Sequence, residues 1–107
     1  MNTANTFRFG VGQRFRVNLT TCGNPDFGQA PEQPLPDIPS HFGYADTIDE
    51  ISAMCKRYIS VYGVGFGSWA GGEVFETASN TYKGRISYGG KFFDENSEYG
   101  RWDAMLH

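Results

Sequence analysis

The clearest hydrophobic pattern is an alternation near the start of the chain. Over residues 7–20, apolar side chains occupy one parity and polar side chains the other. The apolar set is Phe7, Phe9, Val11, Phe15, Val17 and Leu19, and the polar set includes Arg8, Arg14, Arg16 and Asn18. A period of two is typical of a strand with one buried face. Because Gly10 and Gly12 interrupt the run, the segment is either a hairpin turning near residues 10–13, which we favour, or one long strand with a bulge.

A helical pattern begins at Thr47. Thr47 and Glu50 have the spacing of a capping box, in which each side chain accepts a hydrogen bond from the other residue's backbone N–H. Apolar residues then recur every three or four positions up to Tyr62, and Gly63 is suited to end the helix. The stripe consists of Ile48, Ile51, Met54, Cys55, Tyr58, Ile59 and Tyr62. We expect this helix to pack on a sheet.

Three short strands are predicted after the helix. The first covers residues 73–77, and Asn80 marks the following turn. The second runs over residues 82–88, and Gly89-Gly90 suits a two-residue hairpin before a third strand at residues 91–94. The spacing of Tyr99, Trp102, Met105 and Leu106 suggests a short terminal helix.

Residues 23–43 contain all five prolines of the chain. Proline lacks a backbone donor and restricts the residue before it, so we predict a long loop here, with His41 as a loop residue. Loops of this length are often functional. The alternative is a passive connector pinned to the core by Phe27, Leu35 and Ile38.

Together these elements predict an α+β fold, an antiparallel sheet of four to five strands with one main helix packed on one face. Residues 1–107 make a single domain of common size, with the proline-rich loop at about residues 23–43. The composition agrees, because 9 Phe, 6 Tyr and 14 Gly favour strands and tight turns.

Charge and cysteine content narrow the class of protein. A net charge of −3 argues against unaided binding to a phosphate backbone. Cys22 and Cys55 are the only cysteines, and we interpret them as free thiols in a reducing compartment. With no charged, apolar leader and no membrane-spanning run in the sequence, we expect a cytoplasmic location and no membrane partner.

Catalytic chemistry has little support in the sequence. His41 and His107 are the only histidines, and nothing places either beside a cysteine or in a set of metal ligands. The glycines of residues 63–67 follow a helix instead of preceding one, which is the wrong context for a phosphate loop. We therefore predict no enzyme activity, no cofactor and no metal.

A resemblance covers roughly residues 45–95. It is carried by the capped helix from Thr47 to Tyr62, the run Gly63-Val64-Gly65, and the segments 69–74 and 84–92. These features resemble small proteins of phages, plasmids and other mobile elements of the anti-CRISPR or anti-defence type. The resemblance implies an inhibitor that blocks a host defence complex in a bacterial host, such as a CRISPR-Cas surveillance complex, by occupying a protein surface. It lies in turn and core residues and carries over no site residue.

We therefore predict a non-enzymatic protein-binding inhibitor that is a monomer or a homodimer. Besides the proline-rich loop, the candidate protein-binding residues are Trp69, Asp94, Glu95, Glu98 and Trp102. The first alternative is a nucleic-acid-binding module that uses Arg8, Arg14, Arg16, Lys83 and Arg85. Within the alternating strands, however, the aromatic residues fall on the face opposite the cations, as in an ordinary core face and solvent face. The second alternative is a small structural or assembly subunit.

Overall fold

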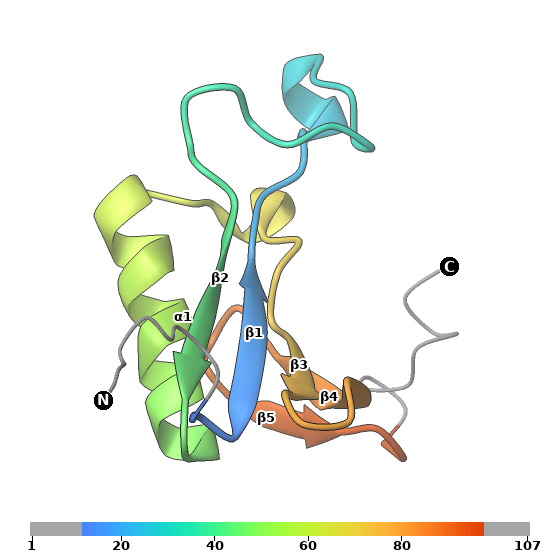
Figure 1. Ribbon diagram of the computed structural model, residues 1–107. Coiled ribbons are helices and arrows are strands. Elements are labelled where there is room, and N and C mark those ends of the chain that lie inside the picture. Colours follow the sequence, from blue (N-terminus) through green and yellow to red (C-terminus); the bar gives the residue numbers. More distant parts are fainter. Residues whose placement is uncertain (1–11, 98–107) are drawn as a thin grey trace.

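In the computed structural model, which describes residues 12–97, five strands form one antiparallel sheet with an α-helix against one face (Figure 1). The strands follow the spatial order β2-β1-β3-β4-β5. Their bounds are β1 Phe15–Leu19, β2 His41–Ala45, β3 Glu73–Glu76, β4 Thr81–Ile86 and β5 Phe92–Asp94, and the helix α1 is Ile48–Tyr62. The predicted α+β fold is confirmed.

The first described strand, β1, lies inside the sheet. It pairs with β2 along one edge and with β3 along the other. Phe15, Val17 and Leu19 are buried, which confirms the alternation predicted for this part of the segment. Neither edge of β1 is free for a hairpin arm, and residues 7–11 of the predicted alternation lie outside the described part of the chain.

The helix α1 begins and ends where the sequence predicted. The Glu50 N–H donates to Thr47 Oγ1 at 3.1 Å, and the Thr47 N–H donates to Glu50 Oε1 at 3.2 Å. Gly63 adopts a left-handed conformation with φ 62°, and its N–H donates to carbonyls of the last turn. This capping box and glycine stop satisfy backbone groups that would otherwise have no partner at the two ends.

The core lies between α1 and the sheet. Ile51 and Cys55 of α1 are fully buried, as are Val17, Val74 and Ile86 of three strands. Burying a large apolar side chain contributes roughly 1.5–3 kcal/mol before conformational entropy is subtracted. This layer supplies the main stabilisation of the fold and fixes how α1 sits beside β1 and β2.

The predicted loop at residues 23–43 is too long at its end, because His41–Gly43 belong to strand β2. Gly43 is buried, and a Cβ atom at this position would lie 2.1 Å from the Met54 sulfur. The space beside Gly43 is therefore filled by Met54 of α1. Because β2 has no apolar side chain at this position, the sequence did not indicate a strand here.

The rest of the proline-rich segment extends beyond the sheet as a loop with a short 3₁₀ turn, Pro25–Phe27 (Figure 1). Its base is held by bonds from the Gly23 N–H to the Gln33 carbonyl at 2.9 Å and from the Tyr58 hydroxyl to the Pro39 carbonyl at 2.7 Å. Ile38 packs against the core, whereas Phe27 is 77% exposed. Phe27 therefore does not pin the loop to the core, as the alternative of a passive connector would require.

The connections between β3, β4 and β5 are tight. Asn80 has φ 58° in the turn before β4, as its position suggested. Between β4 and β5, Tyr88–Gly90 separate the backbone-paired Ser87 and Lys91, and only the second glycine, Gly90, has positive φ. The hairpin loop is therefore longer than the predicted two residues. The predicted terminal helix lies outside the described residues.

Candidate functional site

The predicted acidic contact residues are largely engaged within the chain. Asp94 is exposed, but its carboxylate accepts the N–H groups of Asn96 and Ser97 at 2.9 and 3.1 Å. Glu95 lies 3.9 Å from the Lys83 ammonium in a partly exposed ion pair. Glu98 and Trp102 lie outside the described residues. The described part of the acidic end therefore serves a turn and a surface ion pair.

Trp69 belongs to the core. Its side chain is 9% exposed, its indole N–H donates to the Ile86 carbonyl at 3.1 Å, and its ring lies 6.1 Å from that of Tyr58. The indole lies close to Gly71, where a Cβ atom would be 2.9 Å from the Trp69 ring. This placement leaves Trp69 no exposed ring for a partner, in contrast to its predicted role as a surface contact.

The predicted basic residues are brought together only in part. Arg14 is exposed at the start of β1 and stacks on Phe15, while Arg16 and Arg85 are half-buried on strands. Lys83 lies in β4 and forms the ion pair with Glu95. Arg8 lies outside the described residues.

Strand register gathers aromatic and charged residues on the sheet face away from α1. Directly opposite residues of antiparallel strands share a face, and Arg16 lies opposite both Tyr44 and Phe75. Phe75 lies opposite Tyr82, and Asn18 donates to Glu73 at 2.8 Å. We call this the open face; its members are Arg16, Asn18, Phe42, Tyr44, Glu73, Phe75, Tyr82, Arg85 and Phe93. None of them is buried.

Arg16 lies at the centre of the open face. Its guanidinium carbon is 4.8 Å from the Phe42 ring centre and 4.5 Å from that of Phe75. Such cation–π contacts contribute about 0.5–1 kcal/mol each at exposed sites. The cation is therefore surrounded by aromatic residues of neighbouring strands, although along β1 itself the aromatic residue lies on the opposite face.

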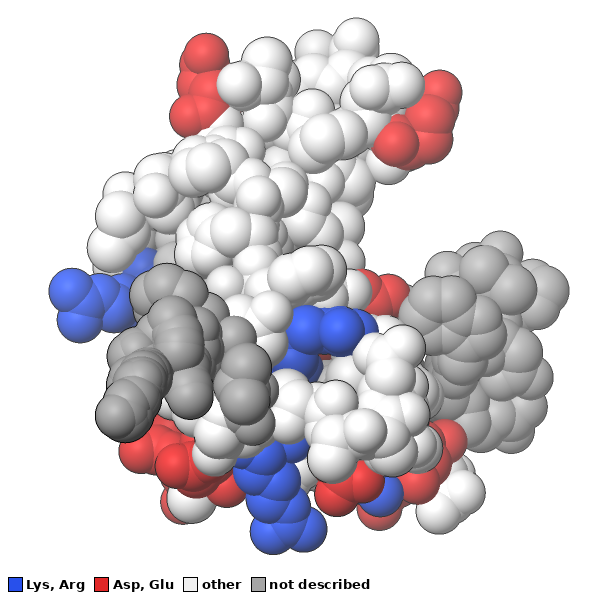
Figure 2. Space-filling model, viewed as in Figure 1, with Lys and Arg blue, Asp and Glu red and all other residues white. Residues whose placement is uncertain are grey.

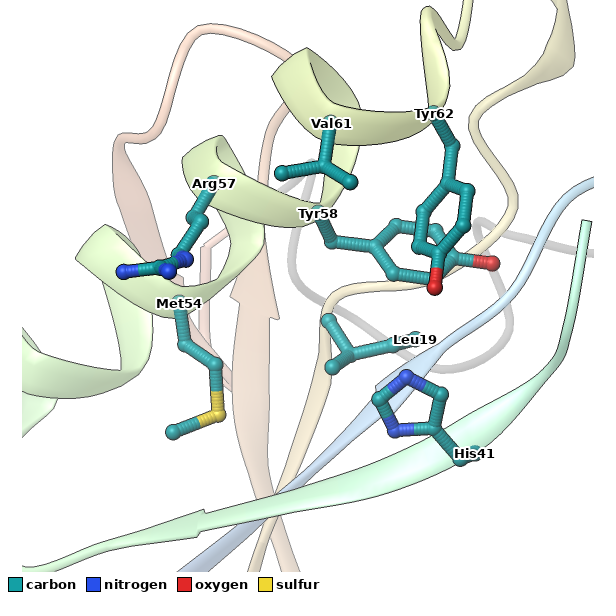
Figure 3. Close-up of a pocket in the computed structure, with 7 residues that line it drawn as sticks. All are labelled: Leu19, His41, Met54, Arg57, Tyr58, Val61 and Tyr62. Atoms are coloured by element: carbon teal, nitrogen blue, oxygen red, sulfur yellow. The ribbon is translucent and has the colours of Figure 1, made fainter.

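A second feature is a pocket between α1 and the edge strand β2. Its volume is about 280 Å³, and Figure 3 shows helix side chains projecting over Leu19 and His41 of the sheet. We call it the α1–β2 groove; it is lined by Leu19, His41, Met54, Arg57, Tyr58, Val61 and Tyr62. A neighbouring pocket also contains Leu19 and His41 and extends to Phe42 on the open face.

Ring contacts hold the floor of the α1–β2 groove. Tyr58 lies 5.7 Å from His41 in an edge-on arrangement and 5.1 Å from Tyr62. Burial, followed by the neighbouring Tyr62, raises the pKa of Tyr58 above its ordinary value, so this hydroxyl remains a neutral donor to the Pro39 carbonyl. The floor is therefore apolar and fixed, while Val61 and Tyr62 remain 64% and 39% exposed at the rim.

Backbone bonds show which groups of β2 point outward. The carbonyls of Arg14 and Asn18 accept bonds from Thr77 and Gly72 on the β3 side. Successive residues of a strand direct their backbone groups to opposite sides, so Phe15, Val17 and Leu19 bond to β2. Their partners in the β1–β2 register are Ala45, Gly43 and His41. The N–H and C=O groups of Phe42 and Tyr44 consequently point to the outer edge, where the described sheet ends.

The possible metal ligands and the buried thiol of residues 12–97 can be described directly. No three His, Cys, Asp or Glu side chains of this part could hold a metal ion. Burial raises the pKa of the Cys55 thiol to about 12, and no disulfide joins Cys55 to Cys22. A thiol that stays protonated at neutral pH is a poor nucleophile.

Comparison of the chain with protein-family models, curated proteins and solved structures gave no match. In the part of the chain that the structure describes, no helix has the length and apolar character needed to cross a membrane.

Proposed function

We propose that this protein is a non-catalytic binding domain that holds a protein partner against the side formed by β2 and α1. The observation that carries the proposal is the exposure of large apolar side chains around one apolar groove. Phe42 is 53% exposed, Val61 64% and Tyr62 39%, and all three lie around the pockets that share Leu19 and His41. Exposed apolar and aromatic groups with a polar surround are typical of protein interfaces.

Charge distribution supports a protein partner over a phosphate backbone. The net charge is −3, and Figure 2 shows Lys or Arg and Asp or Glu side chains interspersed over the viewed face without a large basic patch. Proteins that track a phosphate backbone usually present a continuous basic surface. The inhibitory role within this proposal, with a host defence complex as target, rests on the sequence resemblance alone.

Capture from a bacterial lysate with nuclease treatment tests this function. The tagged protein should retain a stoichiometric protein partner after nuclease, and Val61→Glu should lose it because a carboxylate would replace an exposed apolar side chain at the rim of the groove. Ser60→Glu is the matched control, since Ser60 is exposed on the same helix but does not line the groove. Retention of nothing by the wild-type protein, or equal retention by both variants, would contradict the proposal.

The arrangement around Arg16 supports a second candidate function, binding of single-stranded nucleic acid on the open face. Sheets of this kind stack bases on aromatic rings beside cations. Arg16 Nε and Asn18 Oδ1 are buried and have no hydrogen-bond partner among residues 12–97, so a base could bond to them only after the surrounding side chains move. Fluorescence anisotropy with labelled oligonucleotides over a salt series tests this candidate, which predicts steep weakening with salt.

A further inference from the structure

We infer that the outer edge of β2 and the α1–β2 groove together form a site for an extended peptide segment with an acidic side chain. This inference rests on the proposed protein-binding function and specifies the form of the partner.

The outer edge of β2 presents backbone groups to a partner. Phe42 and Tyr44 direct their N–H and C=O groups away from β1, at the end of the sheet order. An extended peptide can add to such an edge as another strand, with its backbone bonding to these groups, of which the Phe42 carbonyl otherwise lies 3.3 Å from His41 Nδ1. The edge strand has 5 residues and no proline or charged side chain between His41 and Ala45, so two of the usual features that block strand addition are absent from it.

Side chains flank this edge on both faces of the sheet. Successive residues of an added strand point to opposite faces of the sheet. One set would enter the α1–β2 groove and contact Met54, Val61 and Tyr62, while the other would lie beside Phe42 and Tyr44 on the open face. Apolar residues at alternate positions of the peptide therefore suit both sides of the edge.

The α1–β2 groove also carries a positive charge. Among residues 12–97, Arg57 is the only Lys, Arg, Asp or Glu residue that lines the groove, and it has no ion pair with any other of these residues. The nearest acidic residues along the chain, Asp49 and Glu50, lie at the opposite end of α1, where Glu50 is held in the capping box. The groove therefore presents one unpaired cation beside an apolar wall, which fits a peptide with an Asp or Glu next to its apolar residues.

Selection from a displayed library of random linear peptides tests the site without knowledge of the natural partner. The enriched peptides should alternate apolar residues and carry Asp or Glu, and on titration into labelled protein they should shift the Phe42, Tyr44 and Val61 amide resonances. A selection that yields no binder, or binders that shift only resonances outside β2 and α1, overturns the inference.

Two pairs of variants separate the contribution of the β2 backbone edge from that of the charge in the groove. Tyr44→Pro and Tyr44→Val both remove the aromatic ring, but only proline removes the outward N–H, and an edge strand tolerates proline at such a position. We expect Tyr44→Pro to bind the selected peptide about tenfold more weakly than Tyr44→Val, equivalent to about 1.4 kcal/mol. Amide spectra establish that each variant is folded.

The second pair is Arg57→Glu and Lys56→Glu, which make the same change of charge. Lys56 packs beside Gly90 of the β4–β5 loop and does not line the groove. Only Arg57→Glu should lower the affinity for an acidic peptide, by about tenfold or more. Equal affinities within both pairs would overturn the edge-strand site. If the wild-type protein still captured a nuclease-resistant partner, the protein-binding function would stand, whereas loss of capture as well would remove both.

Discussion

The two faces of the sheet use the same strands but differ in what stabilises them. On the face covered by α1, Val17, Val74 and Ile86 are completely buried and belong to the hydrophobic core cluster. On the open face, Arg16 lies between the rings of Phe42 and Phe75, and every member of that face keeps some exposure. The covered face therefore determines whether the chain folds, while the open face and the adjoining β2 edge can change with little cost to stability.

The largest difference should come from deleting core volume. Ile51→Ala on α1 should lower the free energy of unfolding by about 2–5 kcal/mol, because it leaves a cavity among fully buried side chains. Phe42→Ala removes a larger side chain that is 53% exposed and should cost about 1 kcal/mol or less. Urea unfolding measures both. Equal losses would show that the open face is as essential as the covered one.

Replacement of a glycine that closely approaches a neighbouring strand should have the next largest effect on stability. Gly72 has φ 97°, and a Cβ atom there would lie 2.2 Å from the Ile86 carbonyl oxygen. Gly72→Ala should therefore lose about 2–4 kcal/mol of stability through strain and the clash. Gly65→Ala is the control, because Gly65 has φ −81° and nothing lies within 4 Å of its Cβ position. If the thermal unfolding temperature fell equally in both variants, the close approach at Gly72 would be refuted.

The buried thiol of the covered face should produce a pH dependence. Burial raises the pKa of Cys55 from 9.0 to about 12, so the folded state disfavours the thiolate. This contribution to stability is fully present below pH 9 and is lost as pH rises from about 9 to 12. Between pH 8 and pH 10 the wild-type protein should lose about 1 kcal/mol more than Cys55→Ala, as urea midpoints at the two pH values would show. Parallel curves would place the thiol in contact with water.

The smallest effect should come from the centre of the open face. Arg16→Met keeps an unbranched apolar chain between the rings of Phe42 and Phe75 but loses both cation–π contacts. We expect a loss of about 0.5–1 kcal/mol by urea unfolding. Lys91→Met, which removes a single exposed contact with Phe93, should change stability by less than about 0.5 kcal/mol. An Arg16→Met loss comparable with that of Ile51→Ala would make Arg16 a structural residue instead of a surface one.

Local signals explain what could be predicted from the sequence. The limits of α1 follow from Thr47, Glu50 and Gly63, whose roles depend only on residues within one turn of the helix. β3, β4 and β5 also lie near their predicted positions, because Asn80 and Gly90 mark the turns between them.

The parts that could not be predicted depend on contacts between distant segments. β2 was missed because the Met54 side chain occupies the space above Gly43, so the strand shows no apolar alternation. Trp69 looked like a surface anchor because its partner, the Ile86 carbonyl, is remote in the sequence. The α1–β2 groove depends on the same long-range packing.

The open face was missed for a related reason. Alternation along one strand correctly separates Arg16 from Phe15, but the rings around Arg16 come from β2 and β3. Which residues lie side by side across strands is decided by register, and register is set by the whole sheet.

The interior position of β1 also has a consequence for folding during translation. β1 is the first of the five strands to be synthesised, yet its partners are residues 41–45 and 73–76. Until residue 76 has emerged, Phe15, Val17 and Leu19 have at most one neighbouring strand, and their apolar side chains stay accessible to chaperones and to other nascent chains. Synthesis that pauses before β3 should therefore leave an aggregation-prone intermediate, whereas a pause after residue 76 should not.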